Sequence, residues 1–450
     1  MDKIMLTSEF QNLPKNWRIK ELGEVCELCN GYAFKSSSFI NKGVPVIRIG
    51  DIKNFEIDIS NAMQVQISQD YENYQIQNGD LLIAMSGATT GKMGIYKLQN
   101  PAYLNQRVGN LKIKSNEIIP EYRNFALYAL QTEIYKRAYG GAQPNISKGA
   151  IESLKIPLPP LEIQKRIVAR LESAFEKIEK GSAHLQDAKT KLAKYKQSLL
   201  KSAFDGTLTA TASLQGVEKA ETIHKVDCHD LTSSKLAMTD KENPKLPQGW
   251  TIKTLGEIAF VTKLAGFEYT KYIYPNLSDF GIPLFKGKNI QGNKLILKFE
   301  SYIPKEISNQ LERSKLNKKC ILTPYVGSIG NVAIFDGSFE AHLGSNVGKI
   351  EILNNNALEE YMCYFLQSGI GYLELTKHKK ATAQESISIA AIRDVKIPLP
   401  PLEIQKQIVK LLEKHLQHAD KTGEFIESAL NKAKQLKQSL LKSAFAGELV

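Results

Sequence analysis

The amino-acid sequence contains one arrangement of segments twice, and this repeat strongly limits the folds open to the chain. Residues 156–172 read IPLPPLEIQKRIVARLE and residues 397–413 read IPLPPLEIQKQIVKLLE, and 14 of these 17 positions are identical. The segment KQSLLKSAF occurs at 196–204 and again at 437–445, so both pairs of segments are separated by 241 residues. The sequence therefore predicts two related halves, each ending in a strongly similar segment.

The parts of the two halves have diverged to different degrees. Their openings match well, with LPKNWRIKELGEV from Leu13 and LPQGWTIKTLGEI from Leu246. Their middles match only loosely, as in ATTGKMGIY (88–96) and GSIGNVAIF (327–335). Ordinary divergence after duplication would explain this pattern. A common scaffold that carries two recognition elements for different targets would explain it as well, and the uneven divergence favours the scaffold.

Each half is expected to end in a long helix. Pro159-Pro160 and Pro400-Pro401 can enter a helix but cannot continue one from before. Apolar or small residues then follow at alternating steps of three and four, over 171–199 and 412–440, which is the seam of a coiled coil. A helix of about 40–45 residues with one apolar seam needs a partner. Antiparallel pairing of the two helices is the favoured interpretation, and packing of each helix on its own domain is the alternative.

The segment before each long helix mixes two kinds of local pattern. Short β-like runs are broken by Gly and Asn, and helical stretches lie between them. The expected strands include Val44–Ile49, Asp80–Met85 and Cys320–Thr323, and the expected helices include Pro120–Tyr135 and Ala357–Leu366. We interpret each of these segments as an α+β domain.

The whole chain is thus predicted to be of the α+β class, with two mixed domains joined by two long helices. These helices would form an intramolecular antiparallel coiled coil, and the halves would be related by a pseudo-twofold axis. The predicted boundaries are a first mixed domain at 1–155, a first long helix at 156–208, a polar linker at 209–245, a second mixed domain at 246–396 and a second long helix at 397–450.

Composition limits the class of protein. The chain has 450 residues, of which 42% are hydrophobic and 24% charged, as in ordinary globular proteins. No run of eighteen apolar residues is present, so we expect no membrane-spanning helix and no membrane partner. Five cysteines are too few for a disulfide framework, and a cytoplasmic location is expected. The net charge of +12 favours a polyanionic partner, and the excess of basic residues is distributed over both halves.

Catalytic and metal-binding motifs are not convincing anywhere in the sequence. The segment Gly87–Met93 resembles a phosphate-binding loop, but its glycines are too close and Met93 replaces the magnesium-binding Ser or Thr. Cys26 and Cys29 form a lone CxxC pair without a second pair, and His224, Cys228 and His229 fall in the predicted linker. We therefore expect no metal, no cofactor and no catalytic residue. The chain is predicted to bind its target and to depend on other proteins for catalysis.

A distributed basic surface suits a DNA duplex laid along the molecule. Sequence-specific recognition needs amides, hydroxyls and cations on positioned loops, and both mixed domains offer them at corresponding places. The candidates in the first domain are Arg48, Lys53, Thr89, Thr90, Lys92, Asn105, Gln106, Arg107, Gln143 and Asn145. The candidates in the second domain are Lys286, Lys288, Asn289, Ser328, Asn331, Ser345, Asn346, Gln384 and Ser386.

These motifs together resemble a known family. The repeated LPxxWxxxxLGE opening, the IPLPPLEIQ block before a long helix, the ATTGK and GSIGN turns and the AQxxIS segments at 142–147 and 383–388 are similar to those of type I restriction-modification specificity subunits. The resemblance spans nearly the whole chain, in the same order twice. It implies two target-recognition domains, each binding one half of a split, asymmetric site in double-stranded DNA. It also implies a coiled coil that sets the spacing between the half-sites.

The resemblance further implies partners that carry the catalysis. Two methyltransferase subunits, which transfer a methyl group to adenine, would bind this chain, and motor/nuclease subunits would complete the restriction enzyme. The methyltransferases are expected to dock on the proline-block helices and on the KQSLLKSAF ends. The residues expected at that contact are Glu162, Gln164, Ile167, Glu403, Gln405 and Ile408.

Two other functions are open from the sequence. A tandem adaptor could hold two protein partners on a coiled coil without sequence-specific DNA recognition. A fusion of recognition with cleavage or methylation is the third possibility, and the missing motifs make it the weakest.

Overall fold

The structure, a computed structural model, describes residues 13–53, 55–139, 144–209, 246–353, 355–379 and 385–449. It separates into two compact units. Unit 1 comprises residues 1–186 and 427–450, and unit 2 comprises residues 187–426. Within the described ranges, no helix is long and apolar enough to cross a membrane. The predicted linker, apart from Thr209, and with it His224, Cys228 and His229, lies outside the described residues.

Unit 1 has a mixed α/β core with two main sheets. One sheet has the strand order β2-β12-β9-β10-β6-β5 and the other has the order β3-β7-β4-β11-β8, while β1 and β13 form a separate antiparallel pair. The strands are β1 (Arg18–Glu21), β2 (Cys26–Asn30), β3 (Phe39–Ile40), β4 (Val44–Ile47), β5 (Ile52–Lys53), β6 (Phe55–Ile57), β7 (Met63–Val65), β8 (Gln75–Ile76), β9 (Leu81–Ala84), β10 (Met93–Ile95), β11 (Ala102–Leu104), β12 (Val108–Ile113) and β13 (Lys155–Leu158). The short helices are α1 (Leu22–Val25), α2 (Pro120–Ala129), α3 (Gln131–Ala138) and α4 (Lys148–Glu152).

Unit 2 repeats this plan with fewer strands. Its sheets have the orders β15-β24-β21-β22 and β19-β16-β23-β20, with antiparallel pairs β14-β25 and β17-β18. The strands are β14 (Thr251–Thr254), β15 (Ala259–Lys263), β16 (Ile282–Phe285), β17 (Ile290–Gln291), β18 (Lys294–Leu295), β19 (Tyr302–Ile303), β20 (Lys315–Leu316), β21 (Cys320–Pro324), β22 (Ala333–Phe335), β23 (Ala341–Leu343), β24 (Val347–Ile352) and β25 (Lys396–Leu399). The short helices are α7 (Leu255–Ile258), α8 (Gly266–Glu268), α9 (Lys305–Gln310), α10 (Glu359–Gln367), α11 (Gly369–Thr376) and α12 (Ile389–Arg393).

Two long helices begin directly after the double prolines, as predicted. Helix α5 (Leu161–Phe204) and helix α13 (Leu402–Phe445) have 44 residues each. The predicted seam agrees with their burial at most positions, since Ile178, Leu185 and Leu192 are half-buried among exposed neighbours. Leu436 departs from the seam because it is 50% exposed. The predicted mixed α and β content, with long helices, is therefore present in the structure.

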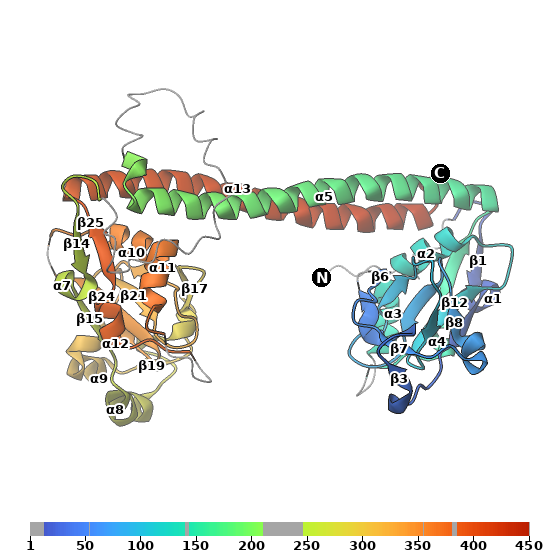
Figure 1. The fold of residues 1–450 in the computed structure, drawn as a ribbon, viewed down its shortest axis with the longest axis horizontal. Coiled ribbons are helices and arrows are strands. Elements are labelled where there is room, and N and C mark those ends of the chain that lie inside the picture. Colours follow the sequence, from blue (N-terminus) through green and yellow to red (C-terminus); the bar gives the residue numbers. More distant parts are fainter. Residues whose placement is uncertain are drawn as a thin grey trace, which may run out of the picture. The chain divides into compact units, whose positions relative to one another are not determined.

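Segments of α5 and α13 lie side by side within each unit (Figure 1). In unit 1, Lys437 of α13 forms an ion pair with Glu179 of α5 at 2.8 Å, and its Nζ lies 5.1 Å from the centre of the Phe175 ring. In unit 2, the Tyr195 hydroxyl of α5 lies 3.1 Å from His415 Nδ1 of α13. In unit 1, Arg170 also contacts Leu449 just after α13, and in unit 2, Leu192 lies beside Gly423. In each unit the residue number along α13 thus falls as the number along α5 rises, so the two segments run antiparallel.

The KQSLLKSAF ends of the two long helices pack into the hydrophobic cores of the units. In unit 1, Leu441, Ala444 and Phe445 belong to the main core, and the Phe445 ring lies 5.3 Å from that of Tyr122 on α2. In unit 2, the Phe204 ring lies 5.3 Å from that of Tyr361 on α10. The apolar face of each end is therefore buried against the globular part of its unit, and docking of a methyltransferase on the exposed polar face of the KQSLLKSAF ends stays a prediction.

Candidate nucleic-acid interface

Four loops of unit 1 meet where the strands of its two sheets end. The Thr89 hydroxyl donates to Ile49 O at 3.1 Å, and this hydrogen bond joins the turn between β9 and β10 to the loop after β4. The loop between β11 and β12 forms hydrogen bonds to two other segments. Asn105 N donates to Ile47 O of β4 at 3.1 Å, and Met85 N, just after β9, donates to Arg107 O at 2.8 Å. Segments far apart in the sequence are thus brought to one place.

The fourth loop of unit 1 precedes α4. Asn145 forms an isolated β-bridge with Ser86, and Gly87 N donates to Pro144 O at 3.1 Å. Gly87 and Gly91 have φ angles of +89° and +83°, which glycine adopts without a steric penalty. The segment 87–91 is therefore a turn between strands, as expected, and its resemblance to a phosphate-binding loop has no structural basis.

Unit 2 assembles its corresponding loops in the same manner. Gly344 N donates to Phe285 O at 2.7 Å, and Tyr325 N donates to Asn346 O at 3.0 Å. Val326 forms an isolated β-bridge with Ser386. Asn346 has a φ of +68°, in the left-handed region that Asn tolerates better than most residues. The same four places in the fold are therefore joined in both units.

Most predicted DNA contacts lie on these loops with exposed or half-exposed side chains. In unit 1 they are Arg48, Lys53, Thr89, Lys92, Asn105, Gln106, Arg107 and Asn145, and in unit 2 they are Lys286, Lys288, Ser328, Asn331, Ser345, Asn346 and Ser386. Gln143 and Gln384 lie outside the described residues. The structure brings together the loops that carry the described candidates of each unit.

Two predicted contacts are buried and have structural roles. Thr90 is fully buried, and its hydroxyl donates to Gly87 O at 2.6 Å or to Pro144 O at 3.1 Å. Asn289 is 2% exposed, and its Nδ2 donates to Ile296 O at 2.9 Å and to Lys298 O at 3.0 Å. Both were expected to face DNA because hydroxyls and amides are common there, but their polar atoms are already satisfied inside the loops. Neither side chain is available to contact DNA.

Charges near the loops are partly neutralised. The Lys53 ammonium pairs with Asp58 at 2.7 Å, and this hydrogen bond lowers the pKa of the Asp58 carboxyl. Lys288 pairs with Glu300. Burial lowers the pKa of Lys286, whose Nζ donates to Ser301 Oγ at 2.7 Å. The loops are therefore polar surfaces with mixed charge rather than uniformly basic patches.

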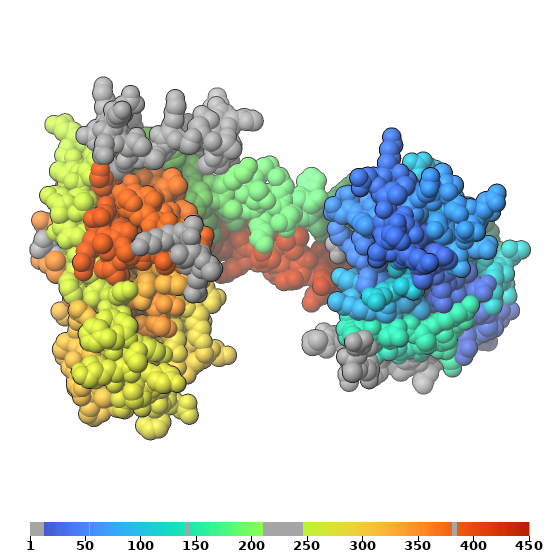
Figure 2. Space-filling view, turned by 60° about the horizontal axis from the view of Figure 1, so that its bottom comes forward, coloured from blue at the N-terminus to red at the C-terminus, as the bar shows by residue number. Residues whose placement is uncertain are grey.

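Aromatic residues that were not predicted from the sequence are half-buried or exposed in both units. In unit 1, the half-buried ring of Tyr32 lies 5.1 Å from that of Tyr71, and Tyr32 forms an isolated β-bridge with Asn105. In unit 2, Phe267 and Phe280 are 69% and 81% exposed on the segment before β16, coloured yellow in Figure 2. The two halves of the sequence differ most in length and composition in this segment, and that difference could have pointed to these aromatic residues.

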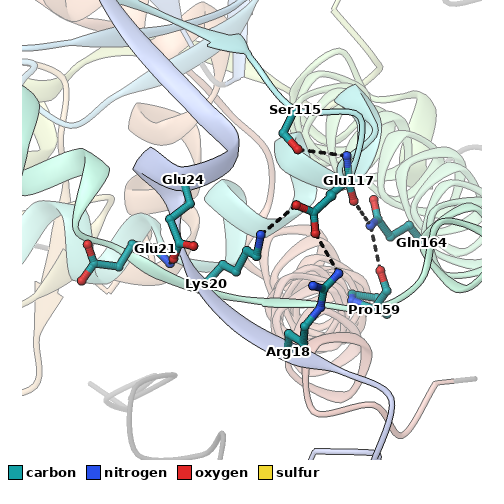
Figure 3. A network of polar contacts seen from close by, with 8 residues as sticks. All are labelled: Arg18, Lys20, Glu21, Glu24, Ser115, Glu117, Pro159 and Gln164. Carbon is teal, nitrogen blue, oxygen red and sulfur yellow. Dashed lines mark hydrogen bonds and ion pairs between the residues drawn. The ribbon is translucent and has the colours of Figure 1, made fainter.

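Four of the six predicted partner contacts are buried instead. Gln164 accepts from Ile119 N at 3.0 Å and donates to Glu117 O and Pro159 O at 2.7 and 2.9 Å, while the Glu117 carboxylate pairs with Arg18 and Lys20 (Figure 3). Gln405 makes the equivalent bonds to Leu358, Asn356 and Pro400. Ile167 and Ile408 are also fully buried. Only Glu162 and Glu403, whose side chains are 79% and 76% exposed, can meet a partner.

Metal ligands and reactive thiols are not found at these sites. Within the described ranges, no group of three or more His, Cys, Asp or Glu side chains is arranged to hold a metal ion. Cys26 lies in the core of unit 1, where burial raises the pKa of its thiol to about 11. A thiol with a raised pKa is a poor metal ligand and a poor nucleophile, so Cys26 is a core residue.

One family of known proteins matches both halves of the chain, including the loops described above. The family model described as "Type I restriction modification DNA specificity domain" matches residues 14–185 and again 247–431. The chain belongs to this specificity family. It is 26% identical over 438 residues to the EcoBI specificity subunit of Escherichia coli, covering 96% of this chain and 86% of that protein. It is 25% identical over 454 residues to the EcoKI specificity subunit of Escherichia coli (strain K12), covering 97% and 90%.

Solved structures of the specificity family share the fold. A chain from a study of complex assembly and conformational transition in the type I R-M system superposes with a TM-score of 0.69 at 19% identity, covering 97% of this chain and 99% of that one. The HsdS subunit from Thermoanaerobacter tengcongensis superposes with a TM-score of 0.52 at 18% identity, covering 97% and 98%. The matched ranges include both sets of loops.

Proposed function

We propose that this protein is the DNA-specificity subunit of a type I restriction-modification complex. It recognises a split, asymmetric site in double-stranded DNA and has no catalytic site of its own. The observation that carries the proposal is the family match in both halves, on two units that assemble corresponding polar loops from divergent sequences. Different side chains on the same loop framework support recognition of a different base sequence by each unit.

The domain plan predicted from the sequence is part of the proposal. Residues 1–155 and 246–396 are the two target-recognition domains, 156–208 and 397–450 are the spacer helices, and 209–245 connect the halves. The spacer helices form one antiparallel coiled coil that relates the halves by a pseudo-twofold axis. Support comes from the two 44-residue helices and from the antiparallel contacts within each unit.

The catalytic partners are two methyltransferase subunits and the motor/nuclease subunits. We infer that the methyltransferases contact the exposed faces at the start of α5 and α13, where Glu162 pairs with Lys165 and Glu403 pairs with Lys406 at 2.8 and 2.7 Å. Repetition of the same exposed charge pattern in both helices supports two equivalent docking places. The buried residues Gln164, Ile167, Gln405 and Ile408 position these faces without contacting the partner.

Methylation mapping tests the function directly. A host expressing the methyltransferase subunit would be sequenced for modified adenine with and without this chain. We expect a split, asymmetric motif only when the chain is present, and replacement of residues 13–155 by those of another family member should change one half of the motif. Assembly of a folded complex without any new motif would instead support the adaptor function. Methylation by the purified chain alone would support the fused enzyme.

A further inference from the structure

The turn after β4 in unit 1 and the turn after β16 in unit 2 have the same construction. In unit 1, Arg48 N donates to Asp51 Oδ2 at 2.8 Å, and in unit 2, Lys286 N donates to Asn289 Oδ1 at 2.9 Å. Both accepting residues are buried, at 6% and 2% exposure. The two halves therefore hold a cation at the same position, but the buried acceptor is an acid in one half and its amide in the other.

Asp51 influences the guanidinium of Arg48 as well as its backbone. The Asp51 Oδ2 atom lies 4.0 Å from Arg48 Nε. Burial raises the pKa of Asp51, while the Arg48 backbone N–H and the Arg48 charge oppose that rise. The carboxylate offsets part of the attraction of the guanidinium for an anionic phosphate, whereas the acceptor atoms on a base edge carry no net charge. The pair therefore favours contact with a base over contact with the DNA backbone.

The inner part of the Arg48 side chain lies inside this turn. Its Nε is shielded from solvent and has no hydrogen-bond acceptor, yet the side chain as a whole is 42% exposed. The exposed surface therefore belongs to other atoms of the side chain, which include the two Nη groups at its end. These groups form a planar fork that matches the O6 and N7 acceptors of guanine in the major groove.

The backbone around Arg48 is fixed within the interface. Ile47 O accepts from Asn105 N, and Ile49 O accepts from the Thr89 hydroxyl, both at 3.1 Å. The residues before and after Arg48 are thus each tied to a different loop. Lys286 differs, because its ammonium is directed to Ser301 Oγ at 2.7 Å and offers no planar fork.

We propose that Arg48 reads a guanine in the half-site bound by unit 1 and that Asp51 is the residue that positions its guanidinium. This proposal rests on the proposed function. It assigns one specificity-determining side chain and one base, and it predicts that substitution affects the preference at a single base pair rather than binding to DNA in general.

The test uses the full chain assembled with its methyltransferase subunits and the DNA site found by methylation mapping. Arg48→Ala should lower the preference for guanine at one position of the first half-site by ~10–100-fold. Arg48→Lys should not restore it, since an ammonium makes no bidentate contact. Asp51→Asn, which copies the residue of unit 2, should lower the preference by a smaller factor. Replacing that guanine with 7-deazaguanine should weaken the wild type and leave Arg48→Ala unaffected.

Matched controls separate a loss of guanine recognition from a general loss of positive charge. Arg18→Gln removes one positive charge of the same unit outside the loops, where Arg18 pairs with Glu117, and should leave the motif unchanged. Lys286→Ala should alter only the other half of the motif. An unchanged motif in Arg48→Ala, or a first half-site without any guanine requirement, would overturn the proposal while leaving the proposed function intact. Absence of any motif with the wild-type chain would overturn the function itself.

Discussion

Gln164 and Gln405 each join a long helix to the globular part of a unit. Both are fully buried, and each side chain accepts one backbone N–H and donates to two backbone carbonyls. A buried amide with matched partners is stable, but its removal leaves several buried backbone groups without partners. These glutamines therefore stabilise the fold and were misassigned to partner binding because they lie in the repeated proline block.

Substitution of Gln164 tests this role. Gln164→Met keeps the side-chain length and removes the hydrogen bonds, so the free energy of unfolding should fall by about 2–3 kcal/mol. Chemical denaturation followed by circular dichroism would measure it. Glu162→Gln, two residues earlier and on the exposed face of the same helix, is the matched control and should change stability little. Equal stabilities of wild type and Gln164→Met would contradict the role.

His342 of unit 2 makes stability depend on pH. The residue is fully buried, its Nδ1 lies 2.9 Å from Leu343 O, and its Nε2 has no partner. Burial lowers its pKa, so the unfolded chain binds a proton at about pH 6.5 when the folded chain does not. The contribution of the neutral His342 side chain to the free energy of unfolding is thus present above about pH 6.5 and is lost as the pH falls below that value. His342→Leu should flatten the dependence of the melting temperature on pH between 5 and 6.5, whereas substitution of the exposed His184 should not.

At the scale of elements, the ends of α5 and α13 act as core segments. Phe204 and Phe445 occupy the same position of the repeated KQSLLKSAF segment, and both are at most 2% exposed. The ring of Phe204 also lies 5.3 Å from that of Phe365 in a T-shaped arrangement. Strong similarity of these ends in the two halves follows from this packing, because Phe445 packs on Tyr122 as Phe204 packs on Tyr361, with ring centres 5.3 Å apart in both units.

Truncation of these rings should destabilise one unit at a time. Phe445→Ala should cost about 3–5 kcal/mol in unit 1, and Phe204→Ala a similar amount in unit 2. Limited proteolysis with mass spectrometry would show which unit opens. Phe425→Ala on α13 is the control, since Phe425 is 73% exposed and its loss should change stability by less than about 0.5 kcal/mol. Simultaneous opening of both units in each variant would contradict the assignment.

At the scale of the whole molecule, each unit contains residues from both halves of the sequence. Unit 1 takes residues 427–450 from the second half, and unit 2 takes residues 187–204 from the first. The residues that follow each long helix contact the start of a mixed domain at corresponding positions in the two units. A Cβ on Gly447 would lie 2.6 Å from Pro14, and one on Gly206 would lie 2.2 Å from Pro247, so glycine permits the close approach in both units. Each half of the sequence therefore completes the unit of the other half.

Deletion of residues 428–450 tests this exchange. The deletion removes Leu441, Ala444 and Phe445 from the core of unit 1, so we expect unit 1 to become sensitive to protease while unit 2 stays resistant. A chain ending at Phe445 keeps these residues and should lose much less stability. Unchanged protease resistance of unit 1 in the longer deletion would show that the exchanged segment is not needed.

The sequence by itself determined the features that depend on periodicity and local chemistry. The repeat predicted two related halves, the double prolines predicted where α5 and α13 begin, and the alternating steps predicted a seam. Such patterns are local, so they can be read without knowing what packs against them. Only the tertiary structure decided which polar residues are free. Thr90, Gln164 and Gln405 are of the types that bind DNA or partners, but each makes a hydrogen bond to a segment distant in sequence. Asn289 instead bonds within its own loop. The burial of a polar side chain depends on those long-range contacts, and no local pattern records them.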